Sequence, residues 1–135
     1  MQQQIYVNLP VKALDRSKRF FASLGFKFKE EFGNGSAACL VVSDTIFVVL
    51  LAEPFFATFT SKPIADAHST TETLLCLTCE SRDDIDELVR LAVAAGGCAR
   101  RAPLKDSFGY SHGFEDLDGH IWTLICMQSQ QNNVL

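Results

Sequence analysis

Two cysteines of this sequence have a spacing that could do chemistry. Cys76 and Cys79 form a CxxC pair, which is the spacing used in disulfide oxidoreductases and in zinc sites. Both uses need a turn or the start of a helix, whereas the surrounding residues 73–79 (TLLCLTC) have the pattern of a β-strand. Residues three apart in a strand point to opposite faces, so we interpret both cysteines as structural.

His112 is the second candidate, because imidazole titrates near neutral pH and can act as an acid, a base or a hydrogen-bond anchor. The sequence offers no evident carboxylate or nucleophile as its partner, so the alternative is a structural hydrogen bond. His68 and His120 lie in connecting segments, and we assign them no role. Glu115 and Asp116 flank a turn, where carboxylates are ordinarily solvated.

Two predicted β-hairpins supply the framework for these residues. Residues 114–125 (FEDLDGHIWTLI) predict two strands joined by a tight turn at Asp118-Gly119. Residues 38–51 (ACLVVSDTIFVVLL) repeat that shape around a polar turn at Ser43-Asp44. Asp44 precedes Asp118 by 74 residues, and this repetition predicts a duplicated unit.

Each hairpin completes a longer series of elements. The first half predicts a strand at 4–11, a helix at 13–24 and a strand at 26–31, and the second half predicts a strand at 73–79, a helix at 81–96 and a short strand at 99–102. We therefore predict one α+β domain over residues 1–135, built from two tandem βαβββ half-modules. Its parts are half-modules at about 1–52 and 73–127, a connector at 53–72 and a frayed tail at 128–135.

The connector is more apolar than a plain linker, because it contains Phe55, Phe56 and Phe59. We expect it to fold back onto the protein. The sequence permits a short helix that caps the core or a lid over a ligand pocket.

Composition excludes several classes of protein. The chain of 135 residues is 47% hydrophobic and 21% charged, which is ordinary for a globular domain. Its net charge of −4 disfavours binding to nucleic acids. It has no apolar run near the roughly 18 residues of a membrane span, and its five cysteines are an odd number in apolar segments. We expect a soluble, cytoplasmic protein with reduced cysteines.

Each predicted half-module has one sheet face that its helix covers and one face left open. Two such halves side by side would form a continuous, curved mixed sheet around a cup, where a small molecule would bind.

The order of elements resembles that of the vicinal oxygen chelate superfamily, the glyoxalase, bleomycin-resistance and extradiol dioxygenase proteins. Residues 9–26 (LPVKALDRSKRFFASLGF) resemble the family's V-x-D-L-x-x-S-x-x-F-Y helix entry, with Ala13 in place of Asp. Residues 114–124 (FEDLDGHIWTL) resemble its D-P-D-G turn, with Leu117 in place of Pro. The likeness covers nearly the whole chain and is greatest to a bacterial subgroup labelled as predicted lactoylglutathione lyases.

The resemblance implies a divalent metal held by His and Glu side chains on the first and last strands of each half. None of the corresponding residues is His, Glu, Asp or Cys, and they are Tyr6, Val49, Leu74 and Thr123. A catalytic divalent ion normally needs three or more protein ligands. We therefore expect the metal site to be lost and no cofactor to be bound. The alternative is a divalent metal with other ligands, such as His112 and Glu115 or groups from another chain.

Strand parity then predicts which residues line the cup. A two-residue turn at Asp118-Gly119 would put Thr123 opposite Phe114, whereas Trp122 has the other parity and should pack under the helix layer. The predicted lining is mostly apolar and suits a neutral or weakly polar ligand. It consists of Tyr6, Asn8, Val49, Leu74, Cys76, Tyr110, His112, Phe114 and Thr123.

Three hypotheses about function follow, and the sequence leaves open whether the protein is an enzyme. The first is a metal-free protein that binds a small organic molecule, for sequestration or sensing. The second is a metal-dependent, glyoxalase-like lyase or a dioxygenase. The third is an interaction module whose cup is filled by Phe55, Phe56 and Phe59. In each case we expect a homodimer, because the edge strand 4–11 needs cover, and no nucleic-acid or membrane partner.

Overall fold

The structure, a computed structural model, describes residues 2–127 and the side chains of all of these but residues 31–34. The tail that we expected to fray, residues 128–135, lies outside the described residues. The chain divides into two compact units, Met1–Ala65 and Asp66–Leu135, and the boundary falls within the predicted connector. Among residues 2–127, no helix has the length and apolar character that a membrane span requires.

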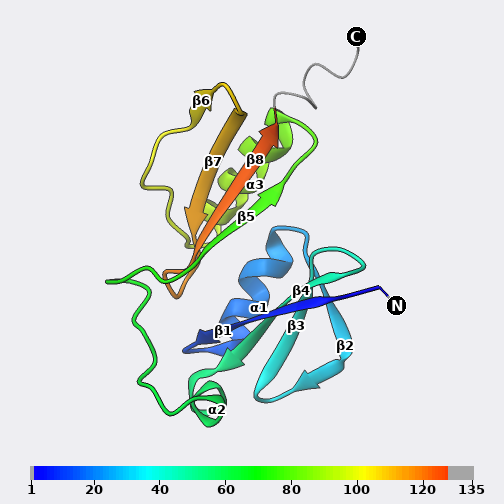
Figure 1. The fold of residues 1–135 in the computed structure, drawn as a ribbon, viewed down its shortest axis with the longest axis vertical. Helices are drawn as coiled ribbons and strands as arrows, with labels where there is room; N and C mark the ends of the chain where they lie inside the picture. Colours follow the sequence, from blue (N-terminus) through cyan, green and yellow to red (C-terminus); the bar gives the residue numbers. More distant parts are fainter. Residues whose placement is uncertain (1, 128–135) are drawn as a thin grey trace. The chain divides into compact units, whose positions relative to one another are not determined.

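The first unit is a four-stranded sheet with one long helix, α1, against one face (Figure 1). The strand order is β1-β4-β3-β2, with β1 parallel to β4 and the other pairs antiparallel. β1 is an edge strand, as we expected for residues 4–11, and an edge position tolerates Pro10. The elements are β1 (Ile5–Val11), α1 (Leu14–Ser23), β2 (Lys27–Asn34), β3 (Ala37–Val41) and β4 (Ile46–Ala52), followed by α2 (Glu53–Phe56) and a short 3₁₀ helix, η1 (Ala57–Phe59).

The core of this unit lies between α1 and the sheet. Phe20 and Phe21 of α1 are buried, and Leu40 and Leu50 of the central strands are also fully enclosed. Gly25 ends the helix with a φ of +97°, a conformation that residues with a side chain rarely adopt. The helix that we predicted at residues 13–24 is therefore confirmed.

The second unit repeats this arrangement, with the strand order β5-β8-β7-β6 and α3 against one face of its sheet (Figure 1). β5 is parallel to β8, and the other pairs are antiparallel. The prediction of a short strand at 99–102 is wrong, because the strand that pairs with β7 at the edge of the sheet is β6. Next to the predicted segment, Cys98 forms a single bridge with Glu115. The elements are β5 (Leu74–Thr78), α3 (Arg82–Ala94), β6 (Leu104–Asp106), β7 (Gly109–Glu115) and β8 (Ile121–Met127).

The pairing register shows how closely the two units correspond. Asn8 pairs with Val49 in the first unit, and the equivalent pair in the second is Cys76 with Thr123. The predicted α+β fold with duplicated βαβββ half-modules is therefore confirmed. Its ladders form two four-stranded sheets, one in each unit, instead of the continuous sheet that we expected.

The two long helices start differently, and this difference predicts opposite effects of two substitutions. The Ser81 hydroxyl accepts a hydrogen bond from the Asp84 backbone nitrogen at 3.1 Å and caps α3, whereas Ala13 precedes α1 in an extended conformation without a side-chain cap. We expect Ser81→Ala to lower the free energy of unfolding by about 1 kcal/mol and Ala13→Ser to raise it by a similar amount. Urea denaturation of both variants tests this. A change of the same sign in the two variants would contradict the capping argument.

Candidate functional site

The candidate site consists of the sheet faces that the long helices leave uncovered, and each is described within its own unit. In the first unit, Tyr6 pairs with Phe47 and Asn8 with Val49, so these four residues share one face, which we name the open face of unit 1. Lys29 lies on the same face, because it pairs with Cys39 and Cys39 pairs with Val49. Three of the predicted lining residues, Tyr6, Asn8 and Val49, are thus brought together.

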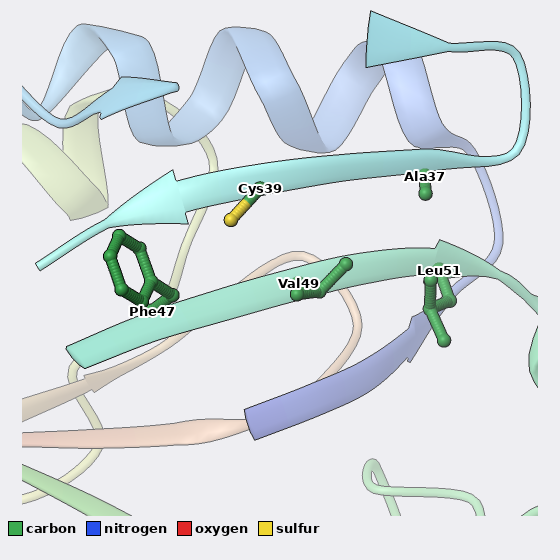
Figure 2. Close-up of a cluster of buried hydrophobic side chains, with 5 residues drawn as sticks. All are labelled: Ala37, Cys39, Phe47, Val49 and Leu51. Atoms are coloured by element: carbon green, nitrogen blue, oxygen red, sulfur yellow. The ribbon is translucent and has the colours of Figure 1, made fainter. Parts of the chain in front are cut away.

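The middle of this open face is an apolar cluster. Figure 2 shows its five members on β3 and β4, and all are at most 6% exposed: Ala37, Cys39, Phe47, Val49 and Leu51. Phe55 and Phe56 of α2 pack against the cluster. Phe59, which contacts the Phe55 ring, is 68% exposed. The connector therefore begins as a short helix that covers part of this apolar cluster, which corresponds to the capping helix among its two predicted roles.

A polar and aromatic group lies at the strand end where Tyr6 pairs with Phe47. The rings of Tyr6 and Phe47 are stacked, with their centroids 4.7 Å apart and their planes at 16°. The Lys29 ammonium lies 4.4 Å from the Phe47 centroid and donates a hydrogen bond of 3.4 Å to the Tyr6 hydroxyl. Tyr6 is 36% exposed and Asn8 is exposed, so both can be reached from solvent.

In the second unit, the open face is the face of the sheet that carries Thr123. Cys76 pairs with Thr123 and Leu74 with Ile121, so the predicted lining residues Leu74, Cys76 and Thr123 share this face. Leu74 is 63% exposed and Cys76 is exposed. Gly113 lies directly opposite Thr123, and it adds no side chain to the face. The result is an accessible apolar surface around one hydroxyl.

The other three predicted lining residues lie on the wrong face. We expected Thr123 to lie opposite Phe114, but Thr123 pairs with Gly113 and Phe114 with Trp122. Asp116 and His120 form the closing pair of the hairpin, so its loop is residues 117–119 and not a two-residue turn. One added loop residue shifts the register by one, and this turns each side chain of β7 to the other face.

Each of these three residues serves packing or hydrogen bonding on the side of α3. They are Tyr110, His112 and Phe114. The Tyr110 hydroxyl donates to the Asp86 carboxylate of α3, and this hydrogen bond is the main reason why the pKa of Tyr110 is raised. His112 Nε2 lies 3.0 Å from the Arg101 carbonyl oxygen, so Nε2 carries a hydrogen. Phe114 stacks on Trp122, which is fully buried as predicted. The structural alternative for His112 is thus the one observed.

Asp116 is a buried carboxylate, contrary to our expectation that it is solvated. It is 5% exposed, and it accepts hydrogen bonds from the backbone nitrogens of Asp118 and His120 and from Trp122 Nε1. Burial raises the pKa of Asp116, and nearby His120 and these hydrogen bonds act in the opposite direction. The spacing of Asp116, Asp118-Gly119 and Trp122 is a signal that could have suggested this arrangement. Its role is to fix the hairpin loop.

The residues at the four implied metal positions do not fit a divalent ion. The side chains of Tyr6, Val49, Leu74 and Thr123 include a phenol and a hydroxyl but no imidazole, carboxylate or thiolate. In the part of the chain that the structure describes, no three His, Cys, Asp or Glu side chains are grouped so that they could hold a metal.

The alternative ligand pair, His112 and Glu115, is also contradicted. The two residues have opposite parity in β7 and therefore point to opposite faces of the sheet. Glu115 is engaged in an ion pair with Arg100, with 2.7 Å between Nε and Oε2.

The CxxC pair lies at the end of β5, and its two cysteines differ in environment. Cys76 is exposed, whereas Cys79 is half-buried, and burial is the first cause that raises the pKa of the Cys79 thiol. A raised pKa keeps a thiol protonated and unreactive at neutral pH. All five cysteines are free, but only Cys39 and Cys126 are buried as core residues, whereas Cys76 and Cys98 are exposed.

Lys29 is one of the residues of the open face of unit 1 that sequence reasoning missed. Residues 26–29 alternate between phenylalanine and lysine, which places Lys27 and Lys29 on one face of β2. The face of β2 that carries the lysines does more than contact solvent, because it belongs to the same sheet face as Tyr6 and Phe47.

Comparison with known proteins identifies the fold. The family model described as "Bleomycin resistance protein-like N-terminal" matches residues 3–43. A hypothetical protein from S. aureus is 25% identical with a TM-score of 0.80, covering 93% of this chain and 94% of its own. A glyoxalase/bleomycin resistance protein/dioxygenase family enzyme from Burkholderia phytofirmans PsJN is 18% identical and superposes with a TM-score of 0.77. The match covers 93% of this chain and 99% of the Burkholderia protein.

An antibiotic-binding protein from Streptomyces sp. CB03234 is 19% identical with a TM-score of 0.65, covering 95% of this chain and 98% of its own. No curated protein matches the sequence. With its duplicated βαβββ units and these relatives, the chain has the fold of the glyoxalase and bleomycin-resistance proteins, which confirms the predicted resemblance to the vicinal oxygen chelate superfamily.

Proposed function

We propose that this protein binds a small organic molecule, for sequestration or sensing, and does not convert it at a metal centre. The observation that carries the proposal is the donor chemistry of the four metal positions of the fold. Tyr6, Val49, Leu74 and Thr123 offer aromatic, aliphatic and hydroxyl groups, which suit contact with an organic ligand better than coordination of a cation.

The relatives support a binding role. The family model that matches residues 3–43 is that of bleomycin-resistance proteins, and a protein of the same fold from Streptomyces is described as antibiotic-binding. We infer that the ligand lies against an open sheet face. Accessible side chains there include Tyr6 and Asn8 in unit 1 and Leu74, Cys76 and Thr123 in unit 2.

Metal analysis combined with thermal denaturation tests this proposal. Purified, untagged protein is incubated with zinc, nickel, manganese or ferrous iron and then analysed by plasma mass spectrometry. We expect less than one retained ion per chain, and a rise in the melting temperature with one member of a small-molecule panel that includes bleomycin. A ligand at 100 times its Kd stabilises the folded state by about 2.7 kcal/mol. One retained ion per chain, with ligand binding abolished by a chelator, would instead favour a metal-dependent lyase or dioxygenase.

The thiol of Cys76 gives a local readout of ligand binding. Cys76 is exposed on the open face of unit 2, and Cys98, the other exposed cysteine, is bridged to Glu115 of β7. A ligand on the open face should slow the reaction of Cys76 with a maleimide. The Cys76→Ser variant gives the reaction of the remaining thiols, which is subtracted from that of the wild type. An unchanged reaction rate of Cys76 in the presence of a bound ligand would argue against binding at this face.

The second candidate function is an interaction module, and the packing of α2 favours it. Phe55 and Phe56 cover part of the apolar cluster on the open face of unit 1, so the protein fills some of this face with its own side chains. A crystal structure without any cavity next to either open face would support this candidate. Bound density on an open face would remove it.

We further propose that the protein is a cytoplasmic homodimer. β1 and β5 are both edge strands of their sheets, and edge strands are common sites of pairing with another chain. Five free cysteines are typical of a reducing compartment. Light scattering coupled to gel filtration tests the oligomeric state, and a monomer at all concentrations would contradict it.

A further inference from the structure

An ion pair lies at one end of the open face of unit 2. Arg100 Nε is 2.7 Å from Glu115 Oε2, and the two side chains are 65% and 20% exposed. Glu115 pairs with Ile121, which has the same parity as Thr123, so the carboxylate belongs to the open face. The short contact keeps the Arg100 guanidinium beside that carboxylate. One donor group and one acceptor group therefore stand together at the margin of an apolar surface.

Both members of this pair keep capacity for hydrogen bonds to a ligand. Within residues 2–127, the guanidinium of Arg100 and the carboxylate of Glu115 have no partner except each other. The Glu87–Arg90 pair of α3 differs, because both oxygens of Glu87 accept hydrogen bonds, from Nε and Nη2 of Arg90, at 2.7 Å. A guanidinium has five hydrogens to donate and a carboxylate has two accepting oxygens, so one short contact leaves most of this capacity unused.

The ion pair is continued by a row of apolar side chains. Glu115 pairs with Ile121 and Ile121 pairs with Leu74, so these three residues lie side by side across β7, β8 and β5 (Figure 1). Ile121 is half-buried, and Leu74 is 63% exposed. Neighbouring strands are about 5 Å apart, so the row is about 10 Å long. A flat, apolar ring can lie along it with one edge at the ion pair.

A planar amide is the ligand group that complements this pair. Its carbonyl oxygen can accept a hydrogen bond from the Arg100 guanidinium, and its N–H can donate one to the Glu115 carboxylate. In a lactam ring the two groups point to the same side, so a single edge makes both contacts. A ligand carboxylate would instead lie close to the carboxylate of Glu115, and a ligand cation close to the guanidinium, which like charges disfavour.

We propose that Arg100 and Glu115 form a subsite for the lactam edge of an uncharged, largely apolar ring that lies over Ile121 and Leu74. Arg100 binds the carbonyl oxygen, and Glu115 determines the preference for an N–H group. The inference rests on the proposed function, because it names the ligand class of the open face of unit 2.

Two uncharged probes of nearly equal shape test the proposal, namely 2-quinolone and coumarin. Both are fused two-ring molecules with a ring carbonyl, but coumarin has a ring oxygen where 2-quinolone has an N–H. Each is titrated into the isotopically labelled full chain, and backbone NMR shifts of β5, β7 and β8 report binding at this face. We expect 2-quinolone to bind about tenfold more tightly, which corresponds to one hydrogen bond to a charged group.

Substitutions of the two residues separate their roles. In Glu115→Leu the acceptor is lost, so the two probes should bind within about twofold of each other. Glu115→Gln keeps an uncharged acceptor, and a preference of about threefold should remain. Arg100→Ala should weaken both probes by a similar factor, because both have the carbonyl oxygen. The ion pair is partly exposed, so we expect all three variants to fold, with urea midpoints near that of the wild type.

The Glu87–Arg90 pair offers a matched control. Its shortest distance is also 2.7 Å, and its side chains are 55% and 64% exposed, but it lies on α3. Glu87→Leu removes a carboxylate from unit 2 and leaves an arginine without that partner, as Glu115→Leu does. We expect this variant to keep the full preference for 2-quinolone.

Two outcomes would overturn the subsite and leave the proposed function standing. The first is equal binding of both probes to the wild type, and the second is a preference that Glu87→Leu removes as fully as Glu115→Leu. If neither probe shifts any residue of β5, β7 or β8 at millimolar concentration, lactams are the wrong ligand class for this face. The proposed function fails by a separate result, namely a melting temperature that no member of the small-molecule panel raises.

Discussion

Replacement of Asp116 by alanine should lower the free energy of unfolding by roughly 3 kcal/mol or more. The carboxylate accepts from the backbone nitrogens of Asp118 and His120 at 2.9 and 3.0 Å, and from Trp122 Nε1 at 3.1 Å. Alanine removes the shared acceptor of three donors at a site that is 5% exposed. A buried donor deprived of its acceptor costs about 1–3 kcal/mol, so the three losses together make this one of the most costly substitutions.

Urea denaturation measures this effect, followed by the fluorescence of the single tryptophan, Trp122, and by circular dichroism. Asp106→Ala is the matched control, because the Asp106 carboxylate also accepts a backbone hydrogen bond, from Phe108 at 2.9 Å, but is exposed. We expect the control to cost less than about 1 kcal/mol. Similar losses in the two variants would mean that burial of Asp116 contributes little.

The same carboxylate predicts a pH dependence. Burial raises the pKa of Asp116 above its ordinary value of 3.8, so the folded protein holds this proton more tightly than the unfolded chain. The part of the stability that comes from this tighter proton binding is therefore complete below pH 3.8 and is lost as the pH rises through the raised pKa. We expect the stability of the wild type relative to Asp116→Asn to fall over that window and then to level off. A relative stability that rises with pH would indicate a lowered pKa instead.

Gly119→Ala should be the second costly substitution, at roughly 3 kcal/mol. Gly119 has a φ of +89°, which strains any residue with a side chain. A Cβ atom here would also lie 2.8 Å from the carbonyl carbon and oxygen of Ala67 and from the backbone nitrogen of His68. These are backbone atoms, so relief requires movement of the connector segment or of the hairpin loop.

Gly25→Ala separates the two causes. Gly25 has a similar φ of +97°, but a Cβ atom there would meet nothing within 4 Å. We expect this variant to lose about 1 kcal/mol, the cost of the backbone conformation alone. The difference between the two variants in chemical denaturation measures the contact of the hairpin loop with Ala67. Equal losses would show that this contact has no influence on stability.

The elements of the fold were largely predictable, because their signals are local. Gly25 and the apolar face of residues 14–24 specify α1, and Ser81 with its following acidic residues specifies the start of α3. Residues 26–29, at the start of the strand that follows α1, alternate between phenylalanine and lysine. Residues 99–106 have only a weak strand pattern, and we predicted the strand at 99–102 although it lies at Leu104–Asp106.

The site was less predictable, since it depends on register. The number of loop residues in the second hairpin decides on which face Tyr110, His112 and Phe114 lie, and Asp118-Gly119 fits both a two-residue and a three-residue loop. The three-residue loop is stabilised by hydrogen bonds to the Asp116 carboxylate, whose partners include the side chain of Trp122. Such a tertiary contact leaves no periodic signal in the sequence.

The two units share a pairing pattern, and this has a kinetic consequence. In both units the first strand joins the sheet through its last strand, β1 with β4 and β5 with β8, so neither sheet can close before its final strand has been synthesised. The equivalent registers also make β8 a competing partner for β1 while the chain folds. Synthesis from the N-terminus reduces this competition, because β4 leaves the ribosome well before β8 and can capture β1 first. Refolding of the complete chain from denaturant lacks that order, and it should therefore populate swapped pairings that synthesis avoids.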